Sequence, residues 1–415
     1  MKTRIKTWLQ RKRGSRTAGQ GDGNEAITAT DLPFRPGTRP TILTPSPSKE
    51  HLAAGSPFFE RLPREVRQYI LILAFGGRIV HMDLSFVHPV ASREPGARPL
   101  SSHAGINADD VHSFVPPRVN WDTRRPKSWQ WWSSVCHRPL PEHLSSPIDR
   151  LRGGAAQPGD DHCRYGAPHN CKLWPGVYPS KCQIGAMGWL LSCRQAYMEG
   201  IHALYKTNTI HMSGQILLSH LPQFLLPQRL SEISSIVITC PLKLHRSSNS
   251  QVVSEVSHLE SLLAMLSSDF HNLARLHLAL TADRVVVDPP SLQVVLKVID
   301  EFVKRHKPSL DQFTVSPSRS LFTPLYEATQ LAIIERMNVP KLSCIPIEIW
   351  RNLDGSHILT EVGSVDEPLA TRFSSPYPKP PHATSRSIGG TVGEGYWIVQ
   401  GDIDDEPPIR EMTCS

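Results

Sequence analysis

The sequence has no apolar run long enough to cross a membrane. Its longest one is Tyr69–Phe75, whereas a membrane-spanning helix needs about 20 mostly apolar residues. The N-terminus also lacks the apolar segment of a secretory signal. We therefore expect a protein of the cytosol or nucleus without a membrane segment, whose eight cysteines stay reduced.

The short motifs of common enzymes are absent as well: the sequence has no phosphate-binding loop, zincin helix, nucleophile elbow or kinase signature. The glycines of Gly389–Gly395 lack the flanking strand and helix of a phosphate loop. Cys136 and His137 are adjacent, and adjacent side chains rarely point at one another, so they make a poor nucleophile and base. We expect no catalytic residues and no cofactor; the alternative is an enzyme whose site is assembled from scattered loop residues.

Cysteine pairs of the C-x-x-C type are also missing. Six residues of the types that bind zinc nevertheless lie close together in the sequence: Cys163, Cys171, Cys182, Cys193, His162 and His169. They leave a structural zinc-binding protein as a further alternative, with Cys163, Cys171 and Cys182 as the candidate ligands. Because the spacing is irregular and Cys193 fits a buried helix face, we expect no bound metal.

The excess of basic residues lies at the N-terminus. The chain has 45 basic and 38 acidic residues, and seven of the basic ones lie in Met1–Gln20, which contains no acid. The remainder is therefore neutral, and a nucleic-acid partner is not expected. The cluster Arg11–Arg13 fits either a nuclear-import signal or a solvated tail.

Proline and glycine divide the chain into unequal parts. Residues 1–55 are predicted to be a disordered basic arm, 88–183 a Pro/Gly-rich insertion, and 365–415 a mostly disordered tail. The folded part is then one domain over residues 56–364. Within the insertion, Ser128–Trp132 (SWQWW) is predicted to be a loop whose tryptophans fill a gap on the domain or form a binding patch.

Met187–Met212 is predicted to be the central element. Five residues recur there at helical spacing: Leu190, Cys193, Tyr197, Ile201 and Leu204. They predict one helix with a buried face. Thr209–Met212 then alternates as a short strand, entered through Asn208. Arg194 and Glu199 are expected to be structural or solvent-facing rather than catalytic.

A second amphipathic helix is predicted at residues 62–75. Leu62, Val66, Ile70 and Leu73 form its apolar face, and Gly76-Gly77 ends it before the strand Arg78–Phe86. This face is the candidate partner-binding surface. The alternative, which we favour from the sequence, is that it packs on the domain's own sheet.

The C-terminal half alternates between strands and helices. Four strands are predicted: Ile236–Cys240, Arg275–Leu280, Gln312–Val315 and Ser343–Trp350. Helices are predicted at Gln251–Ser267, Ser291–His306 and Pro324–Met337. This alternation predicts an α/β fold, a mixed and largely parallel sheet with helices packed on it; α+β and a leucine-rich solenoid remain alternatives. Gly393–Val399 is expected to pair with the sheet or cover its edge.

Two stretches together, Ser56–Leu84 and Gly188–Ile210, resemble the signatures of a fungal uncharacterised family named for its DUF7730 domain. The first signature is an F-box-like LP-x-E-x-R helix with a glycine turn, matched by Leu62, Pro63, Glu65, Arg67, Gly76 and Gly77. The second is CRQ-x-Y-x-E followed by LY-x-x-N-x-[FI], matched by Cys193, Arg194, Gln195, Tyr197, Glu199, Leu204, Tyr205, Asn208 and Ile210. The resemblance covers Ser56–Leu230.

The resemblance implies a mixed α/β domain with no known activity. It favours a non-catalytic protein–protein interaction domain and, through the F-box-like helix, a Skp1-type adaptor as the candidate partner. A true F-box has several helices, whereas this sequence enters a strand after one. The oligomeric state is left open.

Overall fold

The computed structural model describes residues 32–35, 56–89, 91, 121–137, 161, 171, 174–177, 180–246, 252–282, 289–306, 309–338, 348–360, 387–388, 391 and 393–401. The chain divides into two units, 1–34 and 35–415. In the first unit only residues 32–34 are described, and they form no helix or strand. The fold below is that of the second. The basic cluster Arg11–Arg13 and most of the predicted tail lie outside the described residues.

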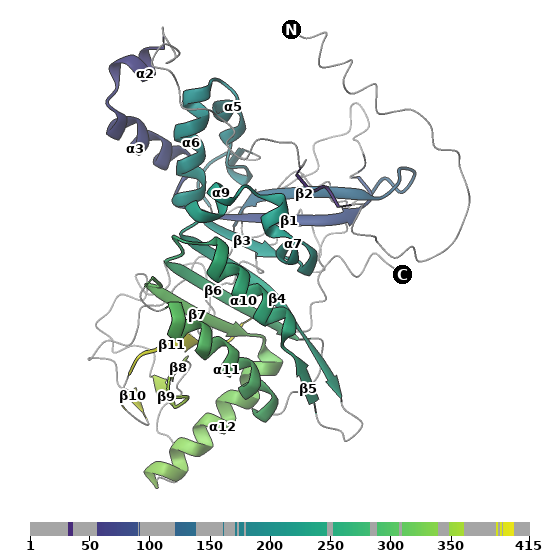
Figure 1. The fold of residues 1–415 in the computed structure, drawn as a ribbon, viewed down its shortest axis with the longest axis vertical. Coiled ribbons are helices and arrows are strands. Elements are labelled where there is room, and N and C mark those ends of the chain that lie inside the picture. Colours follow the sequence, from purple (N-terminus) through teal and green to yellow (C-terminus); the bar gives the residue numbers. More distant parts are fainter. Residues whose placement is uncertain are drawn as a thin grey trace. The chain divides into compact units, whose positions relative to one another are not determined.

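A mixed sheet of eleven strands forms the centre of the second unit (Figure 1). The strands are β1 (Ile79–Val87), β2 (Ser128–Val135), β3 (Thr209–Ser213), β4 (Ser235–Arg246), β5 (Val252–Glu255), β6 (Arg275–Ala282), β7 (Gln312–Pro317), β8 (Glu348–Asn352), β9 (His357–Thr360), β10 (Ser387–Ile388) and β11 (Gly395–Ile398). Their order is β10-β9-β8-β11-β7-β6-β4-β3-β1-β2, and β5 pairs with β4. The pairs from β1 through β3, β4, β6 and β7 to β11 are parallel, which confirms the predicted α/β class with a largely parallel sheet.

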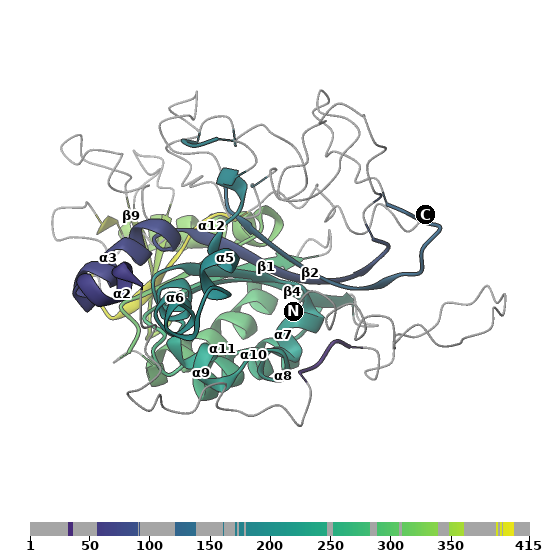
Figure 2. The same ribbon diagram turned by 90° about the horizontal axis from the view of Figure 1, so that it is seen from above.

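The helices follow from the alternation seen in the sequence. They are α2 (Pro57–Arg61), α3 (Arg64–Phe75), α5 (Ala186–Leu190), α6 (Arg194–Lys206), α7 (Gln215–Ser219), α8 (Leu221–Phe224), α9 (Pro227–Glu232), α10 (Ser257–Asp269), α11 (Pro289–His306) and α12 (Arg319–Met337), with a 3-10 turn η8 (Ser180–Cys182). Strands β1, β3, β4, β6 and β7 succeed one another in sequence order across the sheet. Right-handed crossovers that all step the same way place their helices on one face. Figure 2 shows α7, α9, α10 and α11 together on one side of the sheet.

The two faces of the sheet differ in chemistry. The face under the helices is apolar, with buried residues that include Ile236, Ile238, Leu276, Leu278 and Val315. Phe302 of α11 meets Phe313 of β7 there, with ring centroids 6.1 Å apart. The opposite face, which we call the polar face, carries a row of side-by-side residues: His81, His211, Val237, His277 and Thr314. All five are buried.

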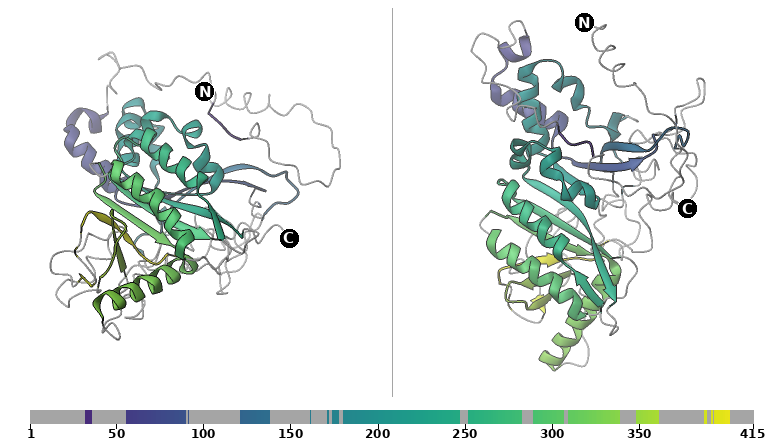
Figure 3. Two further views of the ribbon diagram at one scale, coloured as in Figure 1. Left: turned by 60° about the horizontal axis from the view of Figure 1, so that its bottom comes forward. Right: turned by 45° about the vertical axis from the view of Figure 1, so that its right-hand side comes forward.

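Helices α2, α3, α5 and α6 lie at the end of the sheet where β1 and β3 begin (Figures 1 and 3). The predicted central helix is here two helices, because α5 ends at Leu190 and α6 begins at Arg194. Cys193 is the N-cap of α6, and its sulfur accepts a hydrogen bond from the backbone N–H of Ala196 at 3.4 Å. The placement of Cys193 on a buried helix face was therefore wrong. Leu190 and Ile201 are buried together as predicted, with Tyr197 and Leu204 packed against their cluster.

Two other local predictions differ from the structure. Ser128–Trp132 is not a loop but the start of β2, which pairs with β1 along its whole length. The first residues of the predicted helix Gln251–Ser267 belong to β5, and α10 follows. The C-terminal apolar segment Gly393–Val399 pairs with the sheet, which was one of its two predicted alternatives: β11 lies between β7 and β8.

Candidate functional site

The apolar face predicted on α3 is exposed. Val66, Ile70 and Leu73 keep 42%, 38% and 64% of their surface accessible. Tyr69 and Ile72 are exposed beside them, and Leu62, just before the helix, is half-buried. We call Val66, Tyr69, Ile70 and Leu73 the α3 stripe. The prediction that this face packs on the sheet was wrong, because α3 buries Arg67 and Leu71 instead.

Arg67 decides which side of α3 faces inward. Its guanidinium binds the carboxylate of Glu199 on α6 through two contacts, Nη2 to Oε1 at 2.7 Å and Nε to Oε2 at 2.9 Å. Nη1 also donates to the carbonyl oxygen of Leu62 at 2.6 Å. Burial alone would raise the pKa of Glu199, but the hydrogen bonds from Arg67 and Gln195 lower it below its ordinary value. This pair turns the α3 stripe outward.

Asn208 fixes the other end of the same helix pair. It is buried just after α6. Its Oδ1 accepts from the backbone N–H of Arg78 at 2.9 Å, and its Nδ2 donates to the carbonyl oxygens of Phe75 at 2.7 Å and Leu204 at 2.9 Å. One side chain thus joins the ends of α3 and α6 to the start of β1. Helix α3 is held at both ends.

Gly76 and Gly77 make the turn from α3 into β1. A Cβ at Gly76 would collide with Oγ1 of Thr207, so the close approach of these two segments requires glycine at position 76. Gly77 has φ of +68°, in the left-handed region that side chains rarely adopt. The glycine stop predicted from the sequence is therefore set by two separate constraints.

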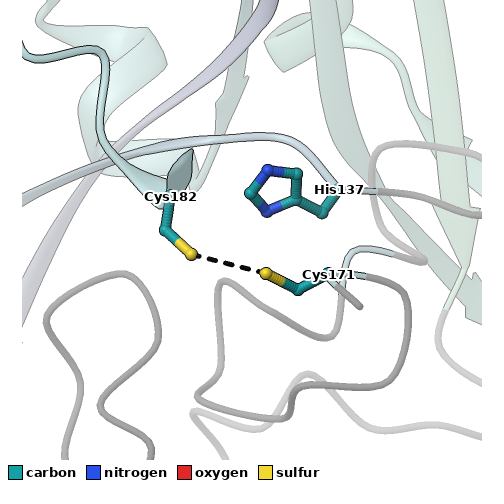
Figure 4. A group of neighbouring side chains, drawn as sticks. All are labelled: His137, Cys171 and Cys182. Carbon is teal, nitrogen blue, oxygen red and sulfur yellow. Dashed lines mark hydrogen bonds between the residues drawn. The ribbon is translucent and has the colours of Figure 1, made fainter. Parts of the chain in front are cut away.

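A second candidate site lies beyond the end of β2. Cys171 and Cys182 are buried there with His137, and their ligand atoms all lie within 4.8 Å of one another. The two Sγ atoms are 3.6 Å apart. Figure 4 shows the imidazole of His137 directed toward both sulfurs.

The surroundings of His137 favour its protonated state. Burial lowers the pKa of His137, but hydrogen bonding to the thiols of Cys171 and Cys182 outweighs it. With the charges of Asp161 and Cys171, the pKa reaches about 9. The group is therefore electrically coupled to Asp161, which is also buried.

The sequence analysis predicted two of these three residues as candidate zinc ligands. Cys171 and Cys182 were candidates for zinc binding; Cys163, His162 and His169 lie outside the described residues, and Cys193 is the N-cap of α6. His137 was considered only as a base for Cys136. The signal that could have found it was its position just past an alternating strand, SWQWWSSV, that pairs with β1.

A chain of hydrogen bonds crosses the polar face beside this group. Nε2 of His81 lies 3.0 Å from Oδ2 of Asp161, and Nδ1 of His81 lies 2.7 Å from Nδ1 of His211. Nε2 of His211 lies 3.1 Å from Oγ1 of Thr239. Since a carboxylate only accepts, one set of tautomers satisfies the chain with both rings neutral: His81 donates to Asp161, His211 donates to His81, and Thr239 donates to His211.

In comparisons with known proteins, a family model matches one part of the chain. The family model of a domain of unknown function, DUF7730, matches residues 148–288. This range contains α5, α6 and the strands β3 to β6, so the second signature lies inside it. The first signature, at residues 62–77, lies outside. No curated protein and no solved structure matches the chain. In the part of the chain that the structure describes, no helix is both long enough and apolar enough to span a membrane.

Proposed function

We propose that this chain is a protein–protein interaction module that binds its partner through the α3 stripe. The observation that carries the proposal is the exposure of Val66, Ile70 and Leu73, at helical spacing, on a helix whose opposite side is anchored. Single exposed apolar residues are ordinary on protein surfaces, but a continuous apolar helix face is typical of a docking surface. It fits a partner that offers an apolar groove.

The contacts that hold α3 in place favour binding. The Arg67–Glu199 pair and the Asn208 hydrogen bonds hold the helix before any partner arrives. A surface ordered in advance loses little conformational entropy on association, which raises its affinity. The α3 stripe is therefore suited to binding without a folding step.

An F-box-like role in a fungal protein of the cytosol or nucleus is the specific form of this proposal, with a Skp1-type adaptor as partner. The objection from the sequence was that one helix leads directly into a strand. Helix α6 packs against both α3 and α5, and the rings of Phe58 and Trp189 join α2 to α5, with centroids 5.0 Å apart. Several helices thus pack together with α3 behind the stripe, although they come from separate parts of the chain.

The experiment is a binding titration of the purified full-length protein with a purified Skp1-type adaptor. Leu73→Glu should weaken binding about tenfold or more, because a charge at the centre of an apolar contact must be desolvated. It should leave the melting temperature nearly unchanged, since Leu73 is exposed. Leu331→Glu, on the far helix α12 and 67% exposed, is the matched control and should bind as the wild type does.

Two results would contradict this proposal. Undiminished binding by Leu73→Glu would remove the α3 stripe as the contact surface. The second result has two parts: the wild-type protein does not bind the adaptor, and it captures another partner that the Leu73→Glu variant does not. This result would remove the F-box-like role but retain the interaction module.

The enzyme alternative would draw on the chain of Asp161, His81 and His211. All three are buried, so a substrate does not reach them in this conformation. An exposed apolar helix face favours an interaction module over an enzyme. A turnover assay against a panel of hydrolase substrates, with His81→Ala as the control, tests the alternative.

A further inference from the structure

The structure assigns a metal site that the irregular spacing of the cysteines along the sequence did not predict. We propose that His137, Cys171 and Cys182 bind a zinc ion, with a fourth position taken by water or another small ligand. The site is independent of the α3 stripe and of the proposed function. It joins His137, two residues after the end of β2, to Cys171 and Cys182.

The distances fit a tetrahedral zinc. With Zn–S bonds of about 2.3 Å, two sulfur ligands lie about 3.8 Å apart, and a sulfur and an imidazole nitrogen about 3.6 Å apart. The Sγ atoms of Cys171 and Cys182 are separated by 3.6 Å. All three ligand atoms fall within 4.8 Å of one another. A small contraction around an ion completes the geometry.

The charges also balance. Zinc binds cysteine as thiolate and histidine as neutral imidazole, so on binding the two thiols and the imidazole each release to solvent any proton that would block coordination. A doubly charged cation with two thiolates and a neutral ring has no net charge. That matters because Cys171, Cys182 and His137 are 1%, 0% and 2% exposed, where an uncompensated charge is costly.

Lys181 ties together the described residues around the two cysteines. Nζ of Lys181 donates to the carbonyl oxygens of Cys171 at 2.6 Å and Trp174 at 3.0 Å. The ring of Trp174 lies against His137, with centroids 5.4 Å apart. These contacts hold both cysteines beside the histidine, as a binding site requires.

A disulfide is the competing use of two neighbouring cysteines. It needs the two sulfurs at about 2.05 Å and has no need of a third residue. The convergence of His137 on both sulfurs is what zinc requires and a disulfide does not.

The neighbouring group of His81, Cys136 and Asp161 is a weaker metal candidate. Its atoms also lie within 4.8 Å of one another. Yet His81 and Asp161 are 3.0 Å apart, closer than the roughly 3.3 Å that separates nitrogen and oxygen ligands on a tetrahedral zinc. His81 and Asp161 are directly hydrogen-bonded to each other. Asp161 therefore acts on the site of His137 through its charge and not as a metal ligand.

The test uses the full-length protein purified under reducing conditions. We expect about one zinc per chain by elemental analysis after dialysis, and, after exchange into Co²⁺, the absorption of a tetrahedral cobalt with thiolate ligands. Cys182→Ala and Cys171→Ala should lose both signals. Cys240→Ala is the matched control: it removes a buried thiol from β4, far from the site in sequence, and should keep both.

His137→Cys keeps the proposal testable if the alanine variants fail to fold. A third thiolate in place of the imidazole should preserve cobalt binding and raise the thiolate-to-cobalt absorption about 1.5-fold, in proportion to the number of thiolates. An unchanged absorption would overturn the proposal. So would folded wild-type protein that neither retains zinc nor binds cobalt, or a Cys171–Cys182 disulfide found by mass spectrometry in the reduced preparation.

Discussion

Arg67 and Glu199 form a two-point ion pair between α3 and α6, although 132 residues separate them in the chain. Arg67 belongs to the LP-x-E-x-R signature and Glu199 to the CRQ-x-Y-x-E signature. Two sequence patterns that look independent therefore meet in one contact. Their co-occurrence in a chain is explained by the packing of these two helices, which also determines that the α3 stripe faces outward.

Removing either partner of this pair should destabilise the protein. Arg67→Met leaves Glu199 as a carboxylate with little solvent, and we expect a loss of roughly 3 kcal/mol in the free energy of unfolding, measured by urea denaturation. Glu199→Gln should give a similar loss. The double variant Arg67→Met/Glu199→Gln should lose less than the sum of the two. Additive losses would show that the two side chains do not interact.

Asn208 should be as important as the ion pair. Asn208→Ala removes three hydrogen bonds and leaves the backbone N–H of Arg78 and two carbonyl oxygens without them, so we expect a loss of about 2–4 kcal/mol in the same measurement. Asn272→Ala is the control. The Asn272 amide donates to the carbonyl oxygen of Ser231 at the surface, and water replaces that partner, so its loss should stay below about 1 kcal/mol. Equal losses from the two variants would contradict this role of Asn208.

His357 should make the protein less stable as the pH falls. Nη1 of Arg351 lies 2.6 Å from Nε2 of His357, and because arginine only donates, that nitrogen must be unprotonated. Burial and the charge of Arg351 lower the pKa of His357 to about 4, although Asp300 opposes them. The contribution of His357 is therefore complete above about pH 6.5, its unfolded pKa, and is lost as the pH falls through about 4.

The size of the effect follows from the difference between the two pKa values. It corresponds to at most about 3 kcal/mol between pH 7 and pH 4. His357→Gln keeps a polar side chain that can accept a hydrogen bond but removes the titration, so the variant's free energy of unfolding should fall by about 3 kcal/mol less over the same range. Denaturation curves of both proteins at several pH values give the comparison, and identical pH profiles would contradict the assignment.

The sequence predicted the sheet because its signal is local. Ile236–Cys240 and Arg275–Leu280 are apolar runs between helices, and both are parallel strands in the interior of the sheet. The helix at residues 64–75 was found for the same reason. Its inward side was not, because an apolar stripe normally faces the core, and here a charged residue, Arg67, faces inward to meet Glu199.

The candidate zinc site shows the same limit. Cys171 and Cys182 were recognised by residue type, but their spacing argued against a metal. His137 enters the group only through the pairing of β2 with β1, a contact that a search along the sequence does not contain. The break between α5 and α6 was also invisible, since Leu190, Cys193 and Tyr197 keep helical spacing across it.

Leu190 and Leu191 offer a sharp test of the helix cluster, because they are neighbours with opposite environments. Leu190 is 7% exposed and packs with Ala186 and Ile201, whereas Leu191 is 76% exposed. Leu190→Asp places a carboxylate among apolar side chains without a cation to pair with, and should cost several kcal/mol. Leu191→Asp keeps its charge in water, so its effect should stay within about 0.5 kcal/mol.

The two variants should therefore separate cleanly in a melting experiment. We expect Leu190→Asp to be insoluble or to melt at least several degrees lower, and Leu191→Asp to melt as the wild type does. Because α3 packs on α6 beside this cluster, a folded Leu190→Asp protein should also bind less of any partner that uses the α3 stripe. A soluble Leu190→Asp protein with an unchanged melting temperature would mean that α5 does not hold α6 in place, and the anchoring of α3 would then rest on Arg67 and Asn208 alone.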